Sequence, residues 1–392
     1  MTVNLIPDCI IANKWHRAAS TLERGTLRFT APTGEVTVFR GARPGPPADF
    51  AVHSWDTFRL AVSRGDIGLG EAYVDGMWDS DDIESLVALF LLNMDRFDGF
   101  ADGNPLQRLG FVVANSLLRR NSLKGSARNI EAHYDVGNDF YSLWLDQSMT
   151  YSAALYGGTE NNLERAQRSK YNRILERLGS RSASILEIGC GWGGFAERAT
   201  DAGNSVTGLT ISPAQHAYAT ARLRGRDADI RLEDYRKARG RFDAIVSIEM
   251  FEAVGEHYWP GYFHTLAERL KRGGRAVVQT ITIRDELFAS YRRRSDFIRH
   301  YVFPGGMLPS RARFIEEAAR AGLKAVDAFS FGQDYARTLR EWAARMEGAR
   351  ESIAALGHNE PFLRNWRFYL AMCAAAFRVE RTDVMQVELV HT

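Results

Sequence analysis

The chain has 392 residues, enough for two domains or one elaborated domain, and its 45% apolar content is that of an ordinary globular protein. A formal net charge of +2 argues against a general nucleic-acid coat, because such proteins bind through many phosphate contacts. The three cysteines are far apart and form no CxxC pair, which indicates a reducing compartment and no metal site. The start of the chain lacks a signal-peptide pattern, and the longest apolar runs, such as Leu86–Met94, are about half of the ~20 residues that span a bilayer. We therefore expect a cytoplasmic protein, at most peripheral to the inner face of the membrane.

The first part of the chain is predicted to form a small α+β domain. Polar and apolar residues alternate over 1–50 between Gly and Pro breaks, a pattern typical of short strands joined by turns. Residues 54–94 are predicted to be helical, with an interruption at 67–80. An amphipathic helix and a break containing Lys, Gly and Ser follow within 102–129, so we place the domain boundary near residue 125.

Residues 126–392 alternate helical and strand-like segments, as expected of an α/β domain. This alternation predicts a mostly parallel sheet with helices on both faces. The strand candidates are SILEIG (184–189), SVTGLTI (205–211), ADIRLED (228–234), FDAIVSI (242–248) and RAVVQTITI (275–283).

The turn GCGWGG directly follows the first of these strands and leads into a helix. Gly189 and Gly191 have no Cβ, so a ligand can lie against the backbone, and the helix N-terminus presents free N–H groups. The pattern differs from the GxGxxG of dinucleotide enzymes, and Glu187 stands just before the turn. A carboxylate there favours a cation over a phosphate, which points to S-adenosylmethionine. The alternative is a purely structural turn.

The ends of the next two strands offer further groups to such a cofactor. Thr210 lies where dinucleotide enzymes usually keep an acidic ribose ligand, and Gln215 lies one turn further on. Asp234 ends the third strand, where a carboxylate can accept a hydrogen bond from an adenine amino group.

Longer motifs extend this pattern over nearly the whole chain. They include WDTFRLAVSRGDIGLGEAYVDGMWD (55–79), HYDVGNDFYSLWLDQSMTYS (133–152), LEIGCGWGG (186–194), GLTISPAQ (208–215), DYR (234–236), IVSIEMFEAVGEHYWPGYF (245–263) and YVFPGGMLPS (301–310). With these motifs the chain resembles the cyclopropane fatty acid synthases and related fatty-acyl methyltransferases. The resemblance implies a Rossmann-like class I methyltransferase domain over 126–392 and a lipid-associated accessory domain over 1–125. It also implies methyl transfer from S-adenosylmethionine, through a carbocation, to the double bond of an unsaturated phospholipid acyl chain.

The resemblance and the strand ends together give one set of expected cofactor-binding residues. This set is Tyr151, Ser152, Glu187, Gly189, Gly191, Thr210, Gln215, Asp234 and Tyr235.

The resemblance also implies a bound bicarbonate ion that removes a proton from the carbocation. In the family a Glu, a His and a Tyr hold this ion together with main-chain groups of a Cys and an Ile. The Glu, Tyr and Ile correspond to Glu252, Tyr335 and Ile281 here, whereas the Cys and His positions hold Ala153 and Gln279. A main-chain contact survives the change to Ala153. Gln279 can still form a hydrogen bond with an anion, but it cannot carry a positive charge.

The change at Gln279 leaves both the base and the product open. Glu249 is a spare candidate for the base, one turn before Glu252 if that segment is helical, and its alternative is a solvated or capping carboxylate. Loss of a proton from the methyl carbon gives a cyclopropane. A hydride shift before that loss gives a methyl-branched alkene, and the two changed positions favour this product slightly.

Aromatic faces in the matching segments could stabilise the cation. The candidates are Tyr151, Tyr156, Phe251, Tyr301 and Phe303, and the alternative for each is core packing.

The expected partner is an unsaturated phospholipid at the membrane surface, without nucleic acid, and a homodimer is left open. A basic amphipathic segment at 112–128, which contains Arg119, Arg120, Lys124 and Arg128, and the run Arg292–Arg294 could rest on anionic lipid, or could be solvated faces. The loop 303–310 could close over the acyl chain or be a static connection. Two other functions stay open: methylation of a soluble small molecule or carrier-bound acyl chain, and non-catalytic lipid binding.

Overall fold

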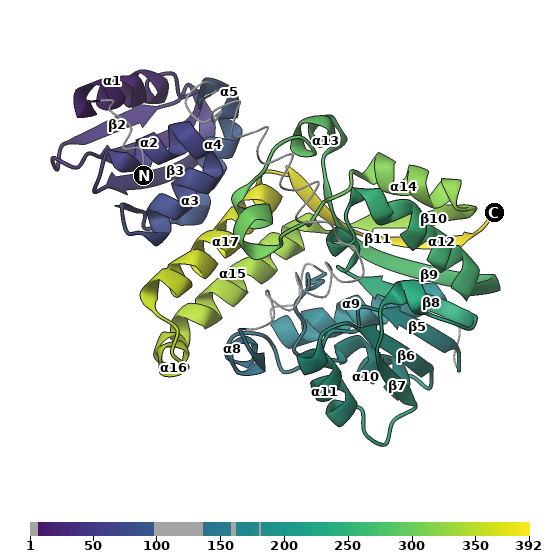
Figure 1. Cartoon of the computed structure of the whole chain (residues 1–392). Coiled ribbons are helices and arrows are strands. Elements are labelled where there is room, and N and C mark those ends of the chain that lie inside the picture. The colour runs from purple at the N-terminus through teal and green to yellow at the C-terminus, as the bar shows by residue number, and fades with distance from the viewer. Residues whose placement is uncertain (1–6, 98–135, 158–161, 180–181) are drawn as a thin grey trace. The chain divides into compact units, whose positions relative to one another are not determined.

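The computed structural model describes residues 7–97, 136–157, 162–179 and 182–392, and the chain forms two compact units (Figure 1). The described part of the first unit comprises 7–97, 293–302 and 354–379. The other described residues form the second unit. The domain boundary expected near residue 125 lies outside the described residues. Two of the segments in the first unit come from the part of the chain that the sequence assigned to the second domain.

The first unit packs helices against a four-stranded sheet of order β2-β1-β3-β4. Trp15 of the first helix stacks on Phe58, with ring centroids 4.5 Å apart, and Phe29 and Phe50 of the sheet complete this aromatic core. The elements are α1 (Asp8–Ala19), β1 (Arg24–Thr30), β2 (Val36–Arg40), β3 (Arg43–Val52), α2 (Asp56–Arg64), α3 (Asp66–Val74), β4 (Trp78–Asp79), α4 (Ile83–Leu92), α5 (Met94–Phe97), the π-helix Ile298–Val302 and α17 (Glu360–Arg378).

Two local expectations for this unit are wrong. Residues 8–19 form a helix instead of strands, because Ile11, Trp15 and Ala19 recur at helical spacing and all three are buried. The expected interruption at 67–80 is mostly the helix α3, whose glycines Gly68 and Gly70 permit close packing.

The second unit is built on a seven-stranded sheet of order β10-β11-β9-β8-β5-β6-β7. The strands are β5 (Ser184–Ile188), β6 (Ser205–Thr210), β7 (Ala228–Leu232), β8 (Phe242–Ile248), β9 (Leu270–Ile283), β10 (Leu323–Ser330) and β11 (Thr382–His391). Neighbours from β7 to β9 pair in parallel, whereas β11 pairs antiparallel with both β9 and β10. The mostly parallel sheet is confirmed, as are the five strand candidates. The antiparallel β10 and β11 were not foreseen.

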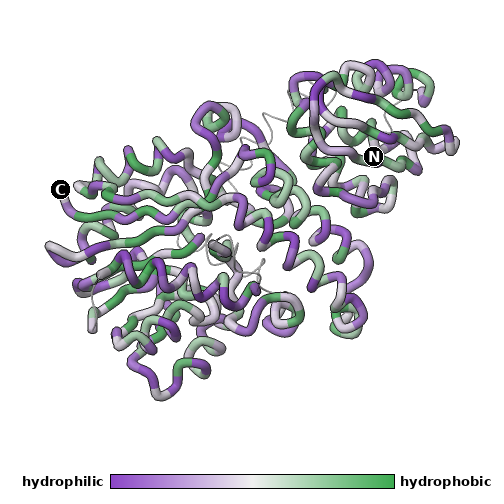
Figure 2. The backbone as a smooth tube through the Cα atoms, turned by 180° about the vertical axis from the view of Figure 1, so that it is seen from behind, coloured by the Kyte–Doolittle hydropathy of each residue, from purple (hydrophilic) through white to green (hydrophobic). Residues whose placement is uncertain are grey.

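Helices cover both faces of this sheet (Figure 1). Leu186 and Ile188 of β5 belong to a core with α12 and α14, whereas Ile185 belongs to a second core with α9 and α10. This division follows from the alternation of side chains along a strand. Figure 2 shows the hydrophobic stretches of the central strands. The helices are α8 (Asn138–Ser142), α9 (Leu163–Leu178), α10 (Gly194–Asp201), α11 (Pro213–Arg222), α12 (Trp259–Arg269), α13 (Asp285–Tyr291), α14 (Arg311–Arg320), α15 (Gly332–Gly348) and α16 (Arg350–Ala355), with 3₁₀ turns at Tyr235–Lys237, Phe251–Ala253 and Glu256–Tyr258.

Among the described residues, no helix combines the length and the apolar composition needed to cross a bilayer. The basic segment expected at 112–128 lies outside the described residues.

Candidate active site

The glycine turn follows β5 at the carboxyl edge of the parallel strands. The amides of Gly189 and Cys190 both donate to the Leu209 carbonyl, at 3.0 and 2.9 Å, which holds the turn against the end of β6. Gly189 and Gly191 have φ values of +83° and +52°, a backbone region that favours glycine. A Cβ at Gly191 would meet no atom of the described residues within 4 Å, so these residues leave open space beside the backbone there.

Glu187 lies in β5 directly before this turn, and its side chain is buried. Its Oε2 atom has no hydrogen-bond partner among the described residues, and burial raises the pKa of Glu187 well above its ordinary value. A buried polar atom without a partner is unfavourable, so a ligand that donates a hydrogen bond here would remove that cost. The open space and the unpartnered oxygen both fit S-adenosylmethionine.

Thr210 and Gln215 lie together at the end of β6 and the start of α11. The Thr210 hydroxyl donates to Gln215 Oε1 at 2.9 Å, and Ser212 caps α11 by accepting from the Gln215 amide at 3.3 Å. Both expected cofactor residues are buried next to the carboxyl edge of the sheet.

Asp234 and Tyr235 follow β7, and Asp234 is already engaged within its own turn. Its carboxylate accepts from Nε and Nη2 of Arg236, at 2.8 and 2.6 Å, and from the Arg236 amide. The Tyr235 ring lies 5.6 Å from that of Tyr262, and burial raises the pKa of Tyr235 to about 12. The ion pair with Arg236 was not foreseen, although the motif DYR places the two residues two positions apart.

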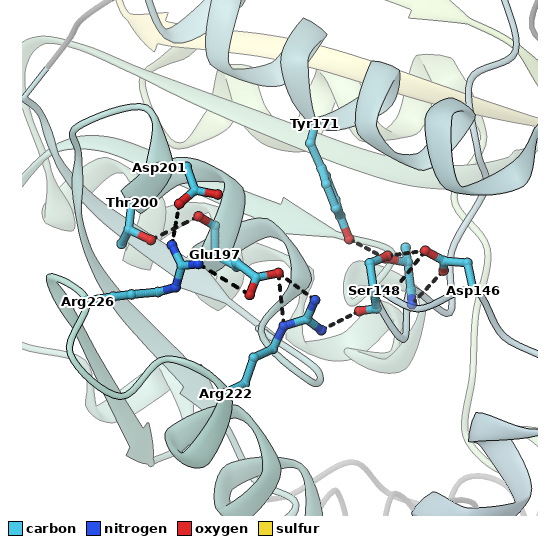
Figure 3. Close-up of polar contacts among 9 residues, drawn as sticks. Asp146, Ser148, Tyr171, Glu197, Thr200, Asp201, Arg222 and Arg226 are labelled. Atoms are coloured by element: carbon cyan, nitrogen blue, oxygen red, sulfur yellow. Dashed lines mark hydrogen bonds and ion pairs between the residues drawn. The ribbon is translucent and has the colours of Figure 1, made fainter.

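A polar cluster fixes the loop 146–150 beside the glycine turn (Figure 3). Arg222 of α11 donates to the Ser148 carbonyl and to Glu197 Oε2, both at 2.6 Å. Asp146 accepts from the amides of Ser148 and Thr150. A Cβ at Gly194 would lie 3.0 Å from the Ser148 carbonyl oxygen, so this glycine permits the close approach of the loop to α10.

The residues after this loop carry the expected site positions 151–153. Tyr151 packs among aromatic rings, with its centroid 5.2 Å from Trp342 and 5.5 Å from Tyr141. The Ser152 hydroxyl accepts from Lys170 Nζ at 2.6 Å, and the Ser152 carbonyl accepts from Gln167 Nε2 at 2.9 Å. The helix α9 therefore holds this segment from one side.

A carboxylate, that of Glu249, lies at the centre of the expected bicarbonate site. It accepts from the Ala153 amide at 2.8 Å, from Gln279 Nε2 at 2.7 Å and from the Tyr335 hydroxyl at 2.7 Å. The sequence analysis left two alternatives open for Glu249, a solvated carboxylate and a capping carboxylate, and both are wrong. The helical spacing to Glu252 is also wrong, because Glu249 follows the end of β8 with a φ of +49°.

Glu252 lies nearby in the short 3₁₀ turn Phe251–Ala253. Its Oε1 accepts from the Ile281 amide and, at 2.9 Å, from the Thr280 hydroxyl, whereas its buried Oε2 has no partner among the described residues. Burial, and then the charge of Glu249, raise the pKa of Glu252 to about 8. The structure thus brings all five expected catalytic positions together, in two hydrogen-bonded groups around two carboxylates.

Several residues of this centre were not found from the sequence. Lys170 is buried, and desolvation lowers its pKa to about 7. Gln386 of β11 donates from Nε2 to Gln279 Oε1 at 3.0 Å and accepts from Arg173 at 2.8 Å. The signal for Gln386 was a polar residue inside the apolar run VMQVELV, in a strand that the sequence analysis did not identify.

The aromatic candidates for cation stabilisation are dispersed. Phe251 is fully buried among Trp259, Tyr262 and Phe314, which favours the packing interpretation. The Tyr156 ring is covered by Arg337, 3.9 Å from its centroid.

The other two aromatic candidates, Tyr301 and Phe303, have different surroundings, and Phe303 begins the loop 303–310. Tyr301 belongs to the first unit and donates to Glu71 there. The loop 303–310, which includes Phe303, is bonded to the site at two points: the Met307 amide donates to the Glu252 carbonyl at 2.8 Å, and the Ile283 amide donates to the Pro309 carbonyl at 2.9 Å.

The sheet, the glycine turn and the acid that precedes it define an S-adenosylmethionine-dependent class I methyltransferase. A model of the mycolic acid cyclopropane synthetase family matches residues 121–387, and the chain belongs to this family. It is 34% identical to the tuberculostearic acid methyltransferase UfaA1 of Mycobacterium tuberculosis, over 97% of this chain and 91% of that protein. It is 36% identical to the cyclopropane-fatty-acyl-phospholipid synthase of Escherichia coli, over 87% of each chain.

Solved structures agree with this assignment. The cyclopropane synthase MmaA2 from Mycobacterium tuberculosis matches with a TM-score of 0.63 and 30% identity, over 67% of this chain and 97% of its own. The mycolic acid cyclopropane synthase CmaA1, complexed with SAH and CTAB, matches with a TM-score of 0.63 and 31% identity over the same shares. A coclaurine N-methyltransferase, at 18% identity and a TM-score of 0.64, shares the fold alone.

Proposed function

We propose that this chain transfers the methyl group of S-adenosylmethionine to a double bond in the acyl chain of an unsaturated phospholipid. The product is a cyclopropane or a methyl-branched fatty acid. The observation that carries the proposal is a pair of neighbouring features at the carboxyl edge of the sheet. One is the glycine turn with a Glu187 oxygen that has no partner among the described residues, and the other is a carboxylate centre formed by Glu249 and Glu252. Relatives similar over most of the chain, whose names include both kinds of product, support this reading.

The cofactor would be held by the expected binding residues of the strand ends, with Glu187 and the backbone at Gly191 nearest to it. When bound, it supplies an electrophilic methyl group. An alkene is a weak nucleophile, so the chain must orient the acyl double bond against that methyl group and exclude water from the resulting carbocation. The buried rings around Tyr151 provide an apolar wall for this purpose.

A carbocation must then lose a proton, which requires a base in a water-poor site. The carboxylate centre follows the end of β8 and contacts β9, beside the glycine turn of β5: Met250, between the two glutamates, would lie 2.8 Å from a Cβ at Gly189. The five catalytic positions of the proposal, Ala153, Glu252, Gln279, Ile281 and Tyr335, belong to this centre.

The phospholipid substrate is tested with purified components. Purified protein is incubated with S-adenosylmethionine and with vesicles of an unsaturated phospholipid, free unsaturated fatty acid or an acyl thioester. We expect S-adenosylhomocysteine release and a mass gain of 14 Da per acyl chain, one CH₂ group, mainly with vesicles. Turnover on free or thioester-bound chains with none on vesicles would contradict the phospholipid substrate. Gas chromatography of the released acyl chains separates cyclopropane from methyl-branched products.

A further inference from the structure

The three donors that surround Glu249 come from distant parts of the chain. The Ala153 amide precedes the first strand of the sheet, Gln279 lies on β9 and Tyr335 lies on α15, and each donor is within 2.8 Å of a Glu249 carboxylate oxygen. These are the positions that the family resemblance assigns to the binding of a bicarbonate ion. In this chain their hydrogen atoms point to a side-chain carboxylate.

The remaining members of the expected bicarbonate site are bonded to each other. The Ile281 amide donates to Glu252, and so does the Thr280 hydroxyl. An anion needs hydrogen-bond donors, and the donors that would serve it here are already engaged by Glu249 and Glu252. The residues present therefore do not fit a bound bicarbonate ion.

The orientation of the Gln279 amide is fixed by a relay of hydrogen bonds. Arg173 of α9 donates to Gln386 Oε1 at 2.8 Å, and Gln386 Nε2 donates to Gln279 Oε1 at 3.0 Å. With its oxygen occupied in this way, Gln279 presents its NH₂ group to Glu249. A glutamine at this position is thus suited to hold a carboxylate.

The backbone at Glu249 is held in an unusual conformation. Its φ of +49° lies in the left-handed region, which is unfavourable for a residue other than glycine. The Glu249 amide donates to the Gln279 carbonyl at 2.8 Å, which ties this conformation to β9. Such strain concentrates at functional sites. At this position the chain has a residue with a carboxylate side chain, although glycine would adopt the same backbone conformation without strain.

The surrounding charges favour ionisation of Glu249 over that of Glu252. Burial raises the pKa of Glu249, but the charge of Lys170 and the bonds from Tyr335, Ala153 and Gln279 act in the opposite direction. For Glu252, burial and the charge of Glu249 both raise the pKa, against the bonds from Ile281 and Thr280. These contacts therefore favour the ionised form at Glu249 more than at Glu252.

We propose that Glu249 is the built-in base of this site and replaces the bicarbonate ion of the family. The inference rests on the proposed function. The alkene electron pair forms a bond to the methyl carbon, and the carbon–sulfur bond breaks with its electrons left on sulfur, which gives S-adenosylhomocysteine. A C–H bond of the transferred methyl group, or of a neighbouring chain carbon after a hydride shift, then breaks. Its electrons close the ring or form the new double bond, and the proton passes to the Glu249 carboxylate.

The first test compares turnover of wild type and Glu249→Gln in bicarbonate-depleted and bicarbonate-supplied buffer. We expect wild type to be equally active in both buffers. Glu249→Gln keeps the shape of the side chain and should lose about 10²–10⁴-fold in kcat, the usual contribution of a general base. Its S-adenosylmethionine affinity should change by less than about threefold. Bicarbonate-dependent wild-type turnover, or a fully active Glu249→Gln, would overturn the proposal.

The second test uses Glu249→Gly, which removes the carboxylate and suits the left-handed backbone. Binding of ¹³C-bicarbonate is followed by NMR on the protein without lipid, so this test does not depend on the proposed function. We expect Glu249→Gly to bind bicarbonate and wild type not to bind it. In a separate turnover assay, which rests on the proposed function, bicarbonate should raise the activity of Glu249→Gly at least tenfold. Glu380→Gly is the matched control, because Glu380 also has a positive φ, of +57°, and is exposed.

The outcomes separate the two proposals. A wild type that turns over none of the acyl substrates refutes the proposed function, while the bicarbonate titration still decides the identity of the anion site. Bicarbonate binding by wild type, or none by a folded Glu249→Gly, would show that Glu249 does not take the place of the ion. If Glu249→Gly fails to fold, the wild-type titration and Glu249→Gln decide the question alone.

Discussion

At the scale of single residues, the candidate cofactor site combines a side-chain group with a backbone segment. Glu187 offers an unpartnered carboxylate oxygen, whereas Gly191 offers backbone without a Cβ. Both positions could be proposed from the sequence, because an acid and spaced glycines stand in one short motif. The ion pair between Asp234 and Arg236 could not be read from the sequence, because it depends on the geometry of the turn after β7.

Gly191→Val is expected to weaken S-adenosylmethionine binding at least tenfold, as measured by calorimetry. The added side chain would enter the open space beside the backbone, and the φ of +52° would become strained. Gly203→Val is the control for strain alone, because Gly203 has a φ of +86° and equally open surroundings in the turn after α10. Equal loss of affinity in both variants, or unchanged affinity in Gly191→Val, would remove Gly191 from the cofactor site.

Glu252 should make stability fall as the pH rises. Its folded pKa of about 8 exceeds its ordinary value of 4.5, so the folded state binds more protons between these values. The stabilisation of the folded state by Glu252 is complete below about pH 4.5 and is lost as the pH rises through about 8. Its size is several kcal/mol, at about 1.4 kcal/mol per pKa unit. Because Gln cannot ionise, Glu252→Gln should show a smaller fall in the free energy of unfolding over this range. Glu249→Gln should lower the pKa of Glu252, seen by ¹³C NMR of the carboxyl group.

The contrary result for Glu252 is equally specific. Identical pH slopes for wild type and Glu252→Gln in urea unfolding would mean that Glu252 is already ionised near pH 7. In that case Glu249 would not be the preferred carboxylate of the pair.

At the scale of elements, the sequence predicted the strands that stand out as short apolar runs. The parallel strands β5, β6 and β8 are short apolar runs buried on both faces, so their positions follow from composition. β10 alternates buried with partly exposed residues and looks like many amphipathic segments, so it was not recognised. Without β10 and β11, the contact from Gln386 to Gln279 could not be foreseen, and Glu249 remained only a spare candidate.

The resemblance implied which residues lie together in the candidate catalytic centre, but it did not imply how they are connected. All five positions carried over from the family lie in one centre, but the residue that joins Ala153, Gln279 and Tyr335 is Glu249. Which carboxylate faces which donor depends on the left-handed turn after β8. A single-residue backbone conformation of this kind leaves no periodic signal in the sequence.

At the scale of the whole molecule, the first unit combines segments that are more than 200 residues apart. A Cβ at Gly70 would lie 2.3 Å from the Phe297 ring and 2.6 Å from the Phe368 ring, so this glycine lets both aromatic side chains pack on α3. Arg364 donates to the Tyr73 carbonyl at 2.6 Å. Contacts between such distant segments have no local signature, which is why the sequence suggested one contiguous boundary near residue 125.

The division into two units predicts where cofactor binding protects the chain. All the expected cofactor residues belong to the second unit. A ligand that binds only the folded state stabilises it by RT ln(1 + [L]/Kd), about 2.7 kcal/mol at a concentration of 100 Kd. At that concentration of S-adenosylhomocysteine, amides of the second unit that exchange only through its unfolding should exchange about 100-fold more slowly, as measured by mass spectrometry. If the units unfold separately, the amides around Trp15 in the first unit should not change. Equal protection of both would instead show one cooperative body, and protection of the first unit alone would contradict the cofactor site.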